Sequence, residues 1–70
     1  MDFIEKSQRE IEPQLSAMGY RFASEVKLGG ERCIVNYINP EENQKLQIVY
    51  ELYTHNAFCK QVYEDVYEEA

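Results

Sequence analysis

The chain has 70 residues, of which 44% are apolar and 29% charged, and its formal net charge at pH 7 is -6. That length allows one small domain, whose limited core leaves little stability to spare. The composition excludes a disordered or low-complexity chain. No apolar run is long enough for a secretory signal or a membrane span, so we expect a cytoplasmic protein.

Residues 2–18 predict an amphipathic helix. Asp2 suits the N-cap position, and Gly19 suits the position just beyond the C-terminus. Pro13 removes a backbone donor within this pattern, so we expect either a kink near Arg9 or a break into two short helices. The apolar residues that recur at helical spacing are Ile4, Ile11, Leu15 and Met18.

Three antiparallel strands are predicted next, because apolar and polar residues alternate over 20–28, 31–38 and 45–53. Gly29-Gly30 is typical of a two-residue hairpin turn. Such a turn places Leu28 opposite Glu31. The facing pairs that follow are Val26 with Cys33, Ser24 with Val35, and Phe22 with Tyr37.

The third strand continues this alternation, with Tyr37 opposite Leu46 across a polar turn that contains Pro40. Strands 20–28 and 45–53 are then both sheet edges, open to a strand from another protein. The predicted core face carries Phe22, Val26, Val35, Tyr37, Ile48 and Tyr50.

The last segment predicts a second helix, capped by Thr54 or Asn56 and running to the end of the chain. The predicted fold is therefore α+β with two layers, in the order helix, three-stranded antiparallel meander, helix, with both helices on one sheet face. The apolar residues that recur three and four apart in the last segment are Phe58, Cys59, Val62, Tyr63, Val66 and Tyr67.

No motif in the chain predicts catalysis, so we expect no enzymatic activity, no cofactor and no metal. The strongest candidates for a thiol or metal site are Cys33, His55 and Cys59. A zinc site needs close pairs of ligands, and a thiol nucleophile needs a base that a third group orients. Neither pattern is present, so the two cysteines are better interpreted as small core residues.

The charge is unevenly distributed, because residues 41–70 hold seven of the 13 acids and two of the seven bases. We therefore predict a small non-enzymatic module that binds a larger protein with a basic surface, and neither nucleic acid nor membrane directly. An inhibitor of a nucleic-acid-handling protein, of the kind common among phage accessory proteins, fits this charge. The predicted contact residues are Tyr53, Tyr63, Glu64, Asp65, Tyr67, Glu68 and Glu69.

The alternative function is self-association through the sheet face that the helices leave open. A homodimer would bury the apolar residues expected there, because an apolar patch with nothing stacked on it is typical of an interface. The residues in this alternative are Ile34, Ile38, Val49 and Tyr53. Six tyrosines in 70 residues favour an interface of either kind.

Overall fold

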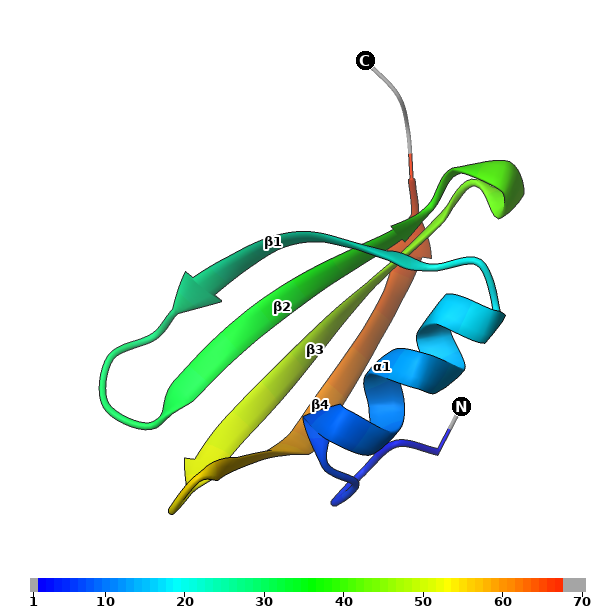
Figure 1. Cartoon of the computed structure of the whole chain (residues 1–70). Helices are drawn as coiled ribbons and strands as arrows, with labels where there is room; N and C mark the ends of the chain where they lie inside the picture. The colour runs from blue at the N-terminus through cyan, green and yellow to red at the C-terminus, as the bar shows by residue number, and fades with distance from the viewer. Residues whose placement is uncertain (1, 68–70) are drawn as a thin grey trace.

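The computed structural model describes residues 2–67, in which one helix packs on one face of a four-stranded antiparallel sheet (Figure 1). The strands lie in chain order, so each pairs with the next. β3 is therefore an interior strand, whereas the sequence predicted an edge there; β1 is an edge, as predicted. The elements are α1 (Gln8–Ala17), β1 (Arg21–Lys27), β2 (Arg32–Asn39), a 3-10 turn at Pro40–Glu42, β3 (Gln44–Tyr53) and β4 (Asn56–Val66).

The prediction of a second helix is wrong, because Asn56–Val66 forms the strand β4. A bulge at Lys60 shifts the alternation along this strand, so that Cys59 before it and Val62 after it both face α1. Apolar residues then recur three and four positions apart, which resembles the helical period. Valine and aromatic residues nevertheless favour strands, and β4 pairs with an edge that β3 would otherwise expose.

Helix α1 begins later than the sequence predicted. Its N-cap is Ser7, whose hydroxyl accepts a hydrogen bond from the Glu10 N–H at 3.3 Å. The residues before it pair with β4 instead: Glu5 donates its N–H to the Cys59 carbonyl at 2.8 Å, and Cys59 donates to the Lys6 carbonyl at 2.9 Å. The predicted N-cap at Asp2 is therefore wrong, because these backbone groups are used in the sheet.

Ile11 and Leu15 form the buried stripe of α1, as their spacing predicted. Ile4 and Met18, the outer members of the predicted stripe, are exposed. Pro13 lies inside a single helix that runs from Gln8 to Ala17, so the predicted break into two helices does not occur.

Three residues separate the bonded residues Leu28 and Arg32 at the turn between β1 and β2, one more than predicted. Leu28 donates its N–H to the Arg32 carbonyl at 3.0 Å, so it does not face Glu31. Gly29 and Gly30 have φ values of 71° and 52°. Glycine adopts these positive values without a Cβ clash, which is why the chain can turn here.

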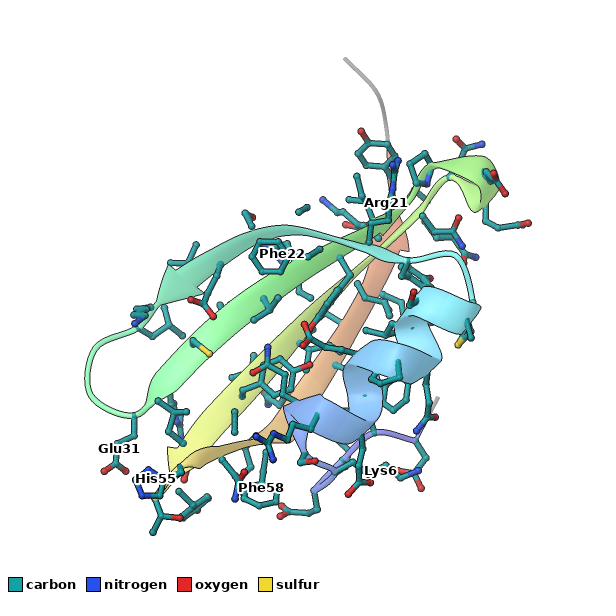
Figure 2. All side chains as sticks on the ribbon, in the orientation of Figure 1. Lys6, Arg21, Phe22, Glu31, His55 and Phe58 are labelled. Carbon is teal, nitrogen blue, oxygen red and sulfur yellow. The ribbon has the colours of Figure 1, made fainter. Side chains whose placement is uncertain are left out.

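The longer loop shifts β1 by one residue relative to β2, so Val26 turns away from α1. A bulge at Ala23 absorbs the shift, and Phe22 still faces Tyr37 as predicted. Phe22 is nevertheless 58% exposed, because α1 packs on the β4 side of the sheet, away from β1 (Figure 2), and Val26 is 51% exposed on the opposite face. The observed pairs are Phe22 with Tyr37, Ser24 with Asn36, Glu25 with Val35, Val26 with Ile34, and Lys27 with Cys33.

The register between β2 and β3 is the predicted one, with Tyr37 opposite Leu46. It aligns the apolar residues of both strands on the face that α1 covers. The core between helix and sheet consists of Phe3, Ile11, Leu15, Tyr20, Cys33, Val35, Tyr37, Leu46, Ile48, Tyr50, Ala57 and Cys59.

Asn39 joins the end of α1 to the β2–β3 connection. Its side-chain amide donates to the Met18 carbonyl at 3.1 Å, and its carbonyl oxygen accepts from the Glu42 N–H at 3.4 Å. Asn39 is buried and lies 3.2 Å from the point where a Cβ on Gly19 would stand. Gly19 has a φ of 95°, so a side chain there would meet both backbone strain and this amide.

The substitution Asn39→Ala should lower the free energy of unfolding by about 1–3 kcal/mol, because it removes two hydrogen bonds that the buried side chain makes to the backbone of Met18 and Glu42. Urea denaturation measures the change. The exposed Asn56→Ala is the control and should change the free energy by less than about 0.5 kcal/mol. Equal effects of the two substitutions would contradict the role given to Asn39.

Candidate functional site

The sheet face opposite α1 is not covered by any other part of residues 2–67 (Figure 1). We call it the open face. Directly paired residues of antiparallel strands point to the same face, and alternate residues along a strand share a face. The register therefore arranges the side chains of the open face in rows that cross the strands.

An apolar row crosses the middle of the open face. Val26 pairs with Ile34, and Ile34 pairs with Val49, so the row spans β1, β2 and β3. Its exposure rises toward the edge of the sheet, from 8% for Val49 to 51% for Val26. The row ends in the exposed side chain of Val26, on the edge strand β1.

Polar rows lie on both sides of the apolar row. On one side Asn36 donates its side-chain amide to the Ser24 hydroxyl at 3.0 Å. On the other side Arg32 and Glu51 form an ion pair at 3.3 Å. The row of Val26, Ile34 and Val49 is thus one residue wide, and on β1 to β3 it lies between polar side chains that are already hydrogen-bonded to each other.

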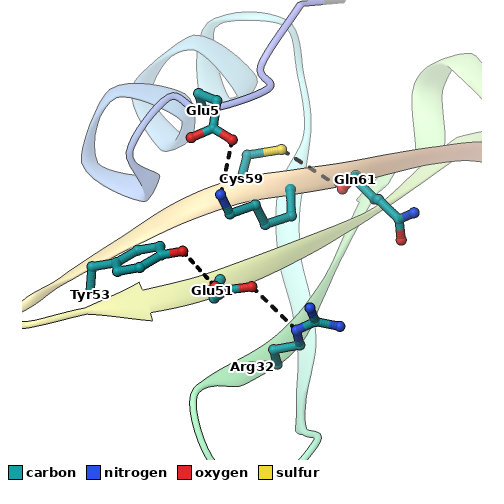
Figure 3. A network of polar contacts seen from close by, with 7 residues as sticks. Glu5, Arg32, Glu51, Tyr53, Cys59 and Gln61 are labelled. Atoms are coloured by element: carbon teal, nitrogen blue, oxygen red, sulfur yellow. Dashed lines mark hydrogen bonds and ion pairs between the residues drawn. The ribbon is translucent and has the colours of Figure 1, made fainter.

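Contacts among Tyr53, Lys60 and Glu5 extend the polar row of Arg32 and Glu51 toward β4 and the segment before α1 (Figure 3). Tyr53 donates its hydroxyl to Glu51 at 2.6 Å, and the ammonium of Lys60 lies 5.4 Å from the centroid of the Tyr53 ring. Lys60 also donates to Glu5 at 2.9 Å. The Tyr53 hydroxyl, followed by Arg32, lowers the pKa of Glu51, and the Glu51 carboxylate raises the pKa of Tyr53.

These contacts are exposed to solvent, so each adds little to stability. Their effect is to orient Tyr53 on the surface. Tyr63 is held in a similar way, because it donates its hydroxyl to the Gln61 side chain at 2.8 Å. Both rings are about half exposed, and both lie on the open face.

The open face carries more positive than negative charge, although the whole chain is acidic. Arg21, Arg32 and Lys45 lie on it, together with the acids Glu51 and Asp65. Asp65 faces Lys45 across β3 and β4, and Glu51 is paired with Arg32. Most acids of the described residues therefore lie on the helix side and in the loops.

Glu64 and Asp65, the two predicted acidic contact residues within residues 2–67, do not lie on one surface. Because the last segment is a strand, Glu64 faces Leu46 on the helix side whereas Asp65 faces Lys45 on the open face. The predicted contact residues Glu68 and Glu69 lie outside the described residues.

The predicted tyrosines have different positions. Tyr53 and Tyr63 lie on the open face, as described above. Tyr67 is half-buried and borders a shallow depression beside Ile38 and Lys45. Its N–H donates to the Asn43 carbonyl at 2.9 Å.

The register places the four residues of the self-association alternative, Ile34, Ile38, Val49 and Tyr53, together on the open face. The sequence reasoning missed Val26 and Phe58 there. Phe58 lies beside Tyr53, with ring centroids 6.1 Å apart. Val26 was assigned to the core face because the loop after it is one residue longer than predicted, and Phe58 was assigned to a helix because the bulge at Lys60 gives β4 a helix-like apolar spacing.

The candidate thiol or metal residues are not brought together. Cys33 and Cys59 both pair with Tyr50, so they lie on either side of it, and burial raises the pKa of both thiols. His55 lies in the exposed turn between β3 and β4 (Figure 2). Within residues 2–67, no group of three or more histidine, cysteine or acidic side chains is arranged to hold a metal ion.

None of the helical structure in residues 2–67 is long and apolar enough to cross a membrane. Comparisons with protein-family models, with curated proteins and with solved structures found no match to this chain.

Proposed function

We propose that this chain is a non-enzymatic protein-binding module that holds an acidic segment of another protein on its open face. The observation that carries this proposal is that one uncovered face combines an apolar row, half-exposed tyrosines and an excess of bases. Aromatic residues and arginine are enriched at protein interfaces, where they contribute much of the binding energy. By covering its partner's own contact surface, such a module would act as an inhibitor or modulator.

The orientation of the tyrosines supports this function. The hydroxyl groups of Tyr53 and Tyr63 are already hydrogen-bonded to neighbours on the same face. A partner that packs on these rings therefore freezes little additional side-chain motion. Such preorganisation strengthens binding because it reduces the entropy lost on association.

The distribution of charge favours an acidic partner segment. A basic partner would be attracted by the overall charge of -6, but Glu64 and Asp65 point to opposite faces and do not form one contact surface. A second copy packed face to face would present the same excess of bases to Arg21 and Lys45. A nucleic acid would need a Lys or Arg for many successive phosphates, whereas the open face carries three bases, Arg21, Arg32 and Lys45, in residues 2–67.

The test compares two double charge reversals that change the net charge equally. In Arg21→Glu with Lys45→Glu the changes lie on the open face, whereas in Lys6→Glu with Arg9→Glu they lie on exposed residues of the helix side. Proteins captured from a source-cell lysate are purified and titrated with each variant. We expect the open-face variant to bind about tenfold more weakly and the helix-side variant to bind within about threefold of the original chain.

Nuclear magnetic resonance of the isotope-labelled chain then locates the contact, and the shifted amide signals should come from the open face. The proposal fails if the two variants lose equal affinity, because overall charge would then explain the binding. It also fails if the recovered partner is nucleic acid, or if the signals that shift belong to α1.

A further inference from the structure

The two edges of the sheet are protected differently. β4 is partly covered, because Glu5 and Lys6 pair with Cys59. β1 pairs only with β2 in the described structure, and all seven of its residues are exposed. An unpaired edge strand exposes backbone donors and acceptors that another strand can bind.

The hydrogen bond at the loop shows which backbone groups of β1 are free. Leu28 donates to Arg32, and residues of an antiparallel strand alternate between bonding to their neighbour and pointing away from it. Val26 therefore directs its backbone groups toward β2, whereas Glu25 and Lys27 direct theirs away from the sheet. Only these outward groups can exchange hydrogen bonds with another strand.

We propose that two copies of this chain pair through β1, antiparallel, about a two-fold axis at Val26. Glu25 of each copy then lies opposite Lys27 of the other and exchanges backbone hydrogen bonds with it. Their side chains share one face, so two pairs of opposite charges form across the axis. The two sheets become one continuous sheet, and this inference does not depend on the proposed function.

The charges of Glu25 and Lys27 favour this register over the registers shifted by one residue in either direction. An axis at Glu25 would place each Glu25 opposite its own copy, and an axis at Lys27 would do the same for Lys27. Like charges directly opposite each other destabilise a strand pair, whereas opposite charges stabilise it. Of the three registers centred on Glu25, Val26 and Lys27, only the one with its axis at Val26 pairs acid with base.

The apolar row supports the same register. The row of Val26, Ile34 and Val49 ends at β1 in one copy. With the axis at Val26, the two rows meet and cross six of the eight strands as one. Leu28, which is exposed and lies on the same face, would stand opposite Ser24 of the other copy and pack beside Val26. The most exposed apolar side chains of the open face at this edge are thereby covered.

A charge exchange tests the pairing. Sedimentation of the full chain at high micromolar concentration should show a dimer, and Glu25→Lys should weaken it about tenfold or more, because both pairs become repulsive. Lys27→Glu should weaken it similarly. The double variant Glu25→Lys with Lys27→Glu should restore dimerisation to within about threefold. A chain that is monomeric, or a double variant no stronger than the single ones, would overturn the proposal.

Crosslinking tests the axis itself. Two facing residues that do not exchange hydrogen bonds have Cα atoms about 4.5 Å apart, which suits a disulfide. The exposed variant Val26→Cys should therefore form a covalent dimer under mild oxidation. In Ser24→Cys the two thiols would lie four residues apart along the strands, roughly 13 Å, and should not react. Equal crosslinking of the two variants would rule out this register, and circular dichroism confirms that each variant is folded.

Discussion

Replacing Leu46 with alanine is expected to lower the free energy of unfolding by about 2–5 kcal/mol. Leu46 is fully buried on the interior strand β3, beside Tyr37 and on the sheet face that α1 covers. The truncation removes apolar contact and leaves a cavity that the close-packed neighbours fill only in part. Because a domain of this size has limited stability, a measurable fraction of the variant should be unfolded without denaturant.

Leu52 supplies a matched control, because it lies on the same strand and on the same face but is 42% exposed. The same substitution there should cost less than about 1 kcal/mol. Urea denaturation of both variants gives the comparison. If Leu52→Ala were as costly as Leu46→Ala, the core would extend to the β3–β4 turn, contrary to the position of α1.

The second large effect concerns pH. Tyr37 and Tyr50 are buried, with their hydroxyl oxygens 2.9 Å apart, and Tyr37 also donates to a carboxylate oxygen of Glu12 at 3.2 Å. Burial disfavours the phenolate, and it raises the pKa of Tyr37 to about 12. Burial raises the pKa of Tyr50 further, and the hydrogen bond to Tyr37 adds to that increase.

The protein should therefore lose stability in alkali. An unfolded tyrosine has a pKa near 10, so above this pH the unfolded chain releases protons that the folded chain retains. The stabilisation is complete below about pH 10 and is lost as the pH rises through about 12. For Tyr37 alone the two-unit difference corresponds to about 2.7 kcal/mol.

Urea denaturation across this pH range should show the decline, and Tyr50→Phe should make it shallower, because the variant has one buried phenol fewer to ionise. The exposed Tyr63→Phe is the control and should keep the original slope. A slope that both substitutions leave unchanged would show that the buried pair does not govern alkaline unfolding.

Some of the fold follows from local sequence patterns. The alternation in β2 and β3, together with the polar turn between them, determined the pairing of Tyr37 with Leu46. The helical spacing of Ile11 and Leu15 determined which side of α1 is buried. These patterns succeed because each reports the period of one unbroken element.

Other features depended on contacts between distant segments. The apolar spacing of Phe58, Val62 and Val66 is compatible with a helix or with a strand that contains a bulge. Pairing with β3 favours the strand conformation, because without β4 the backbone groups on the outer edge of β3 would have no partners in the sheet. The start of α1 was decided in the same way, since Glu5 and Lys6 pair with β4 rather than extending the helix.

The candidate site depended on these tertiary contacts more than the fold did. One added loop residue moved Val26 to the open face and Glu25 to the helix side, and the strand conformation separated Glu64 from Asp65. Sequence by itself determined which residues are apolar, aromatic or charged, and the register of the core strands. The tertiary structure decided which of those residues share a face, because a bulge or a longer loop inverts a strand's alternation without changing the residues that alternate.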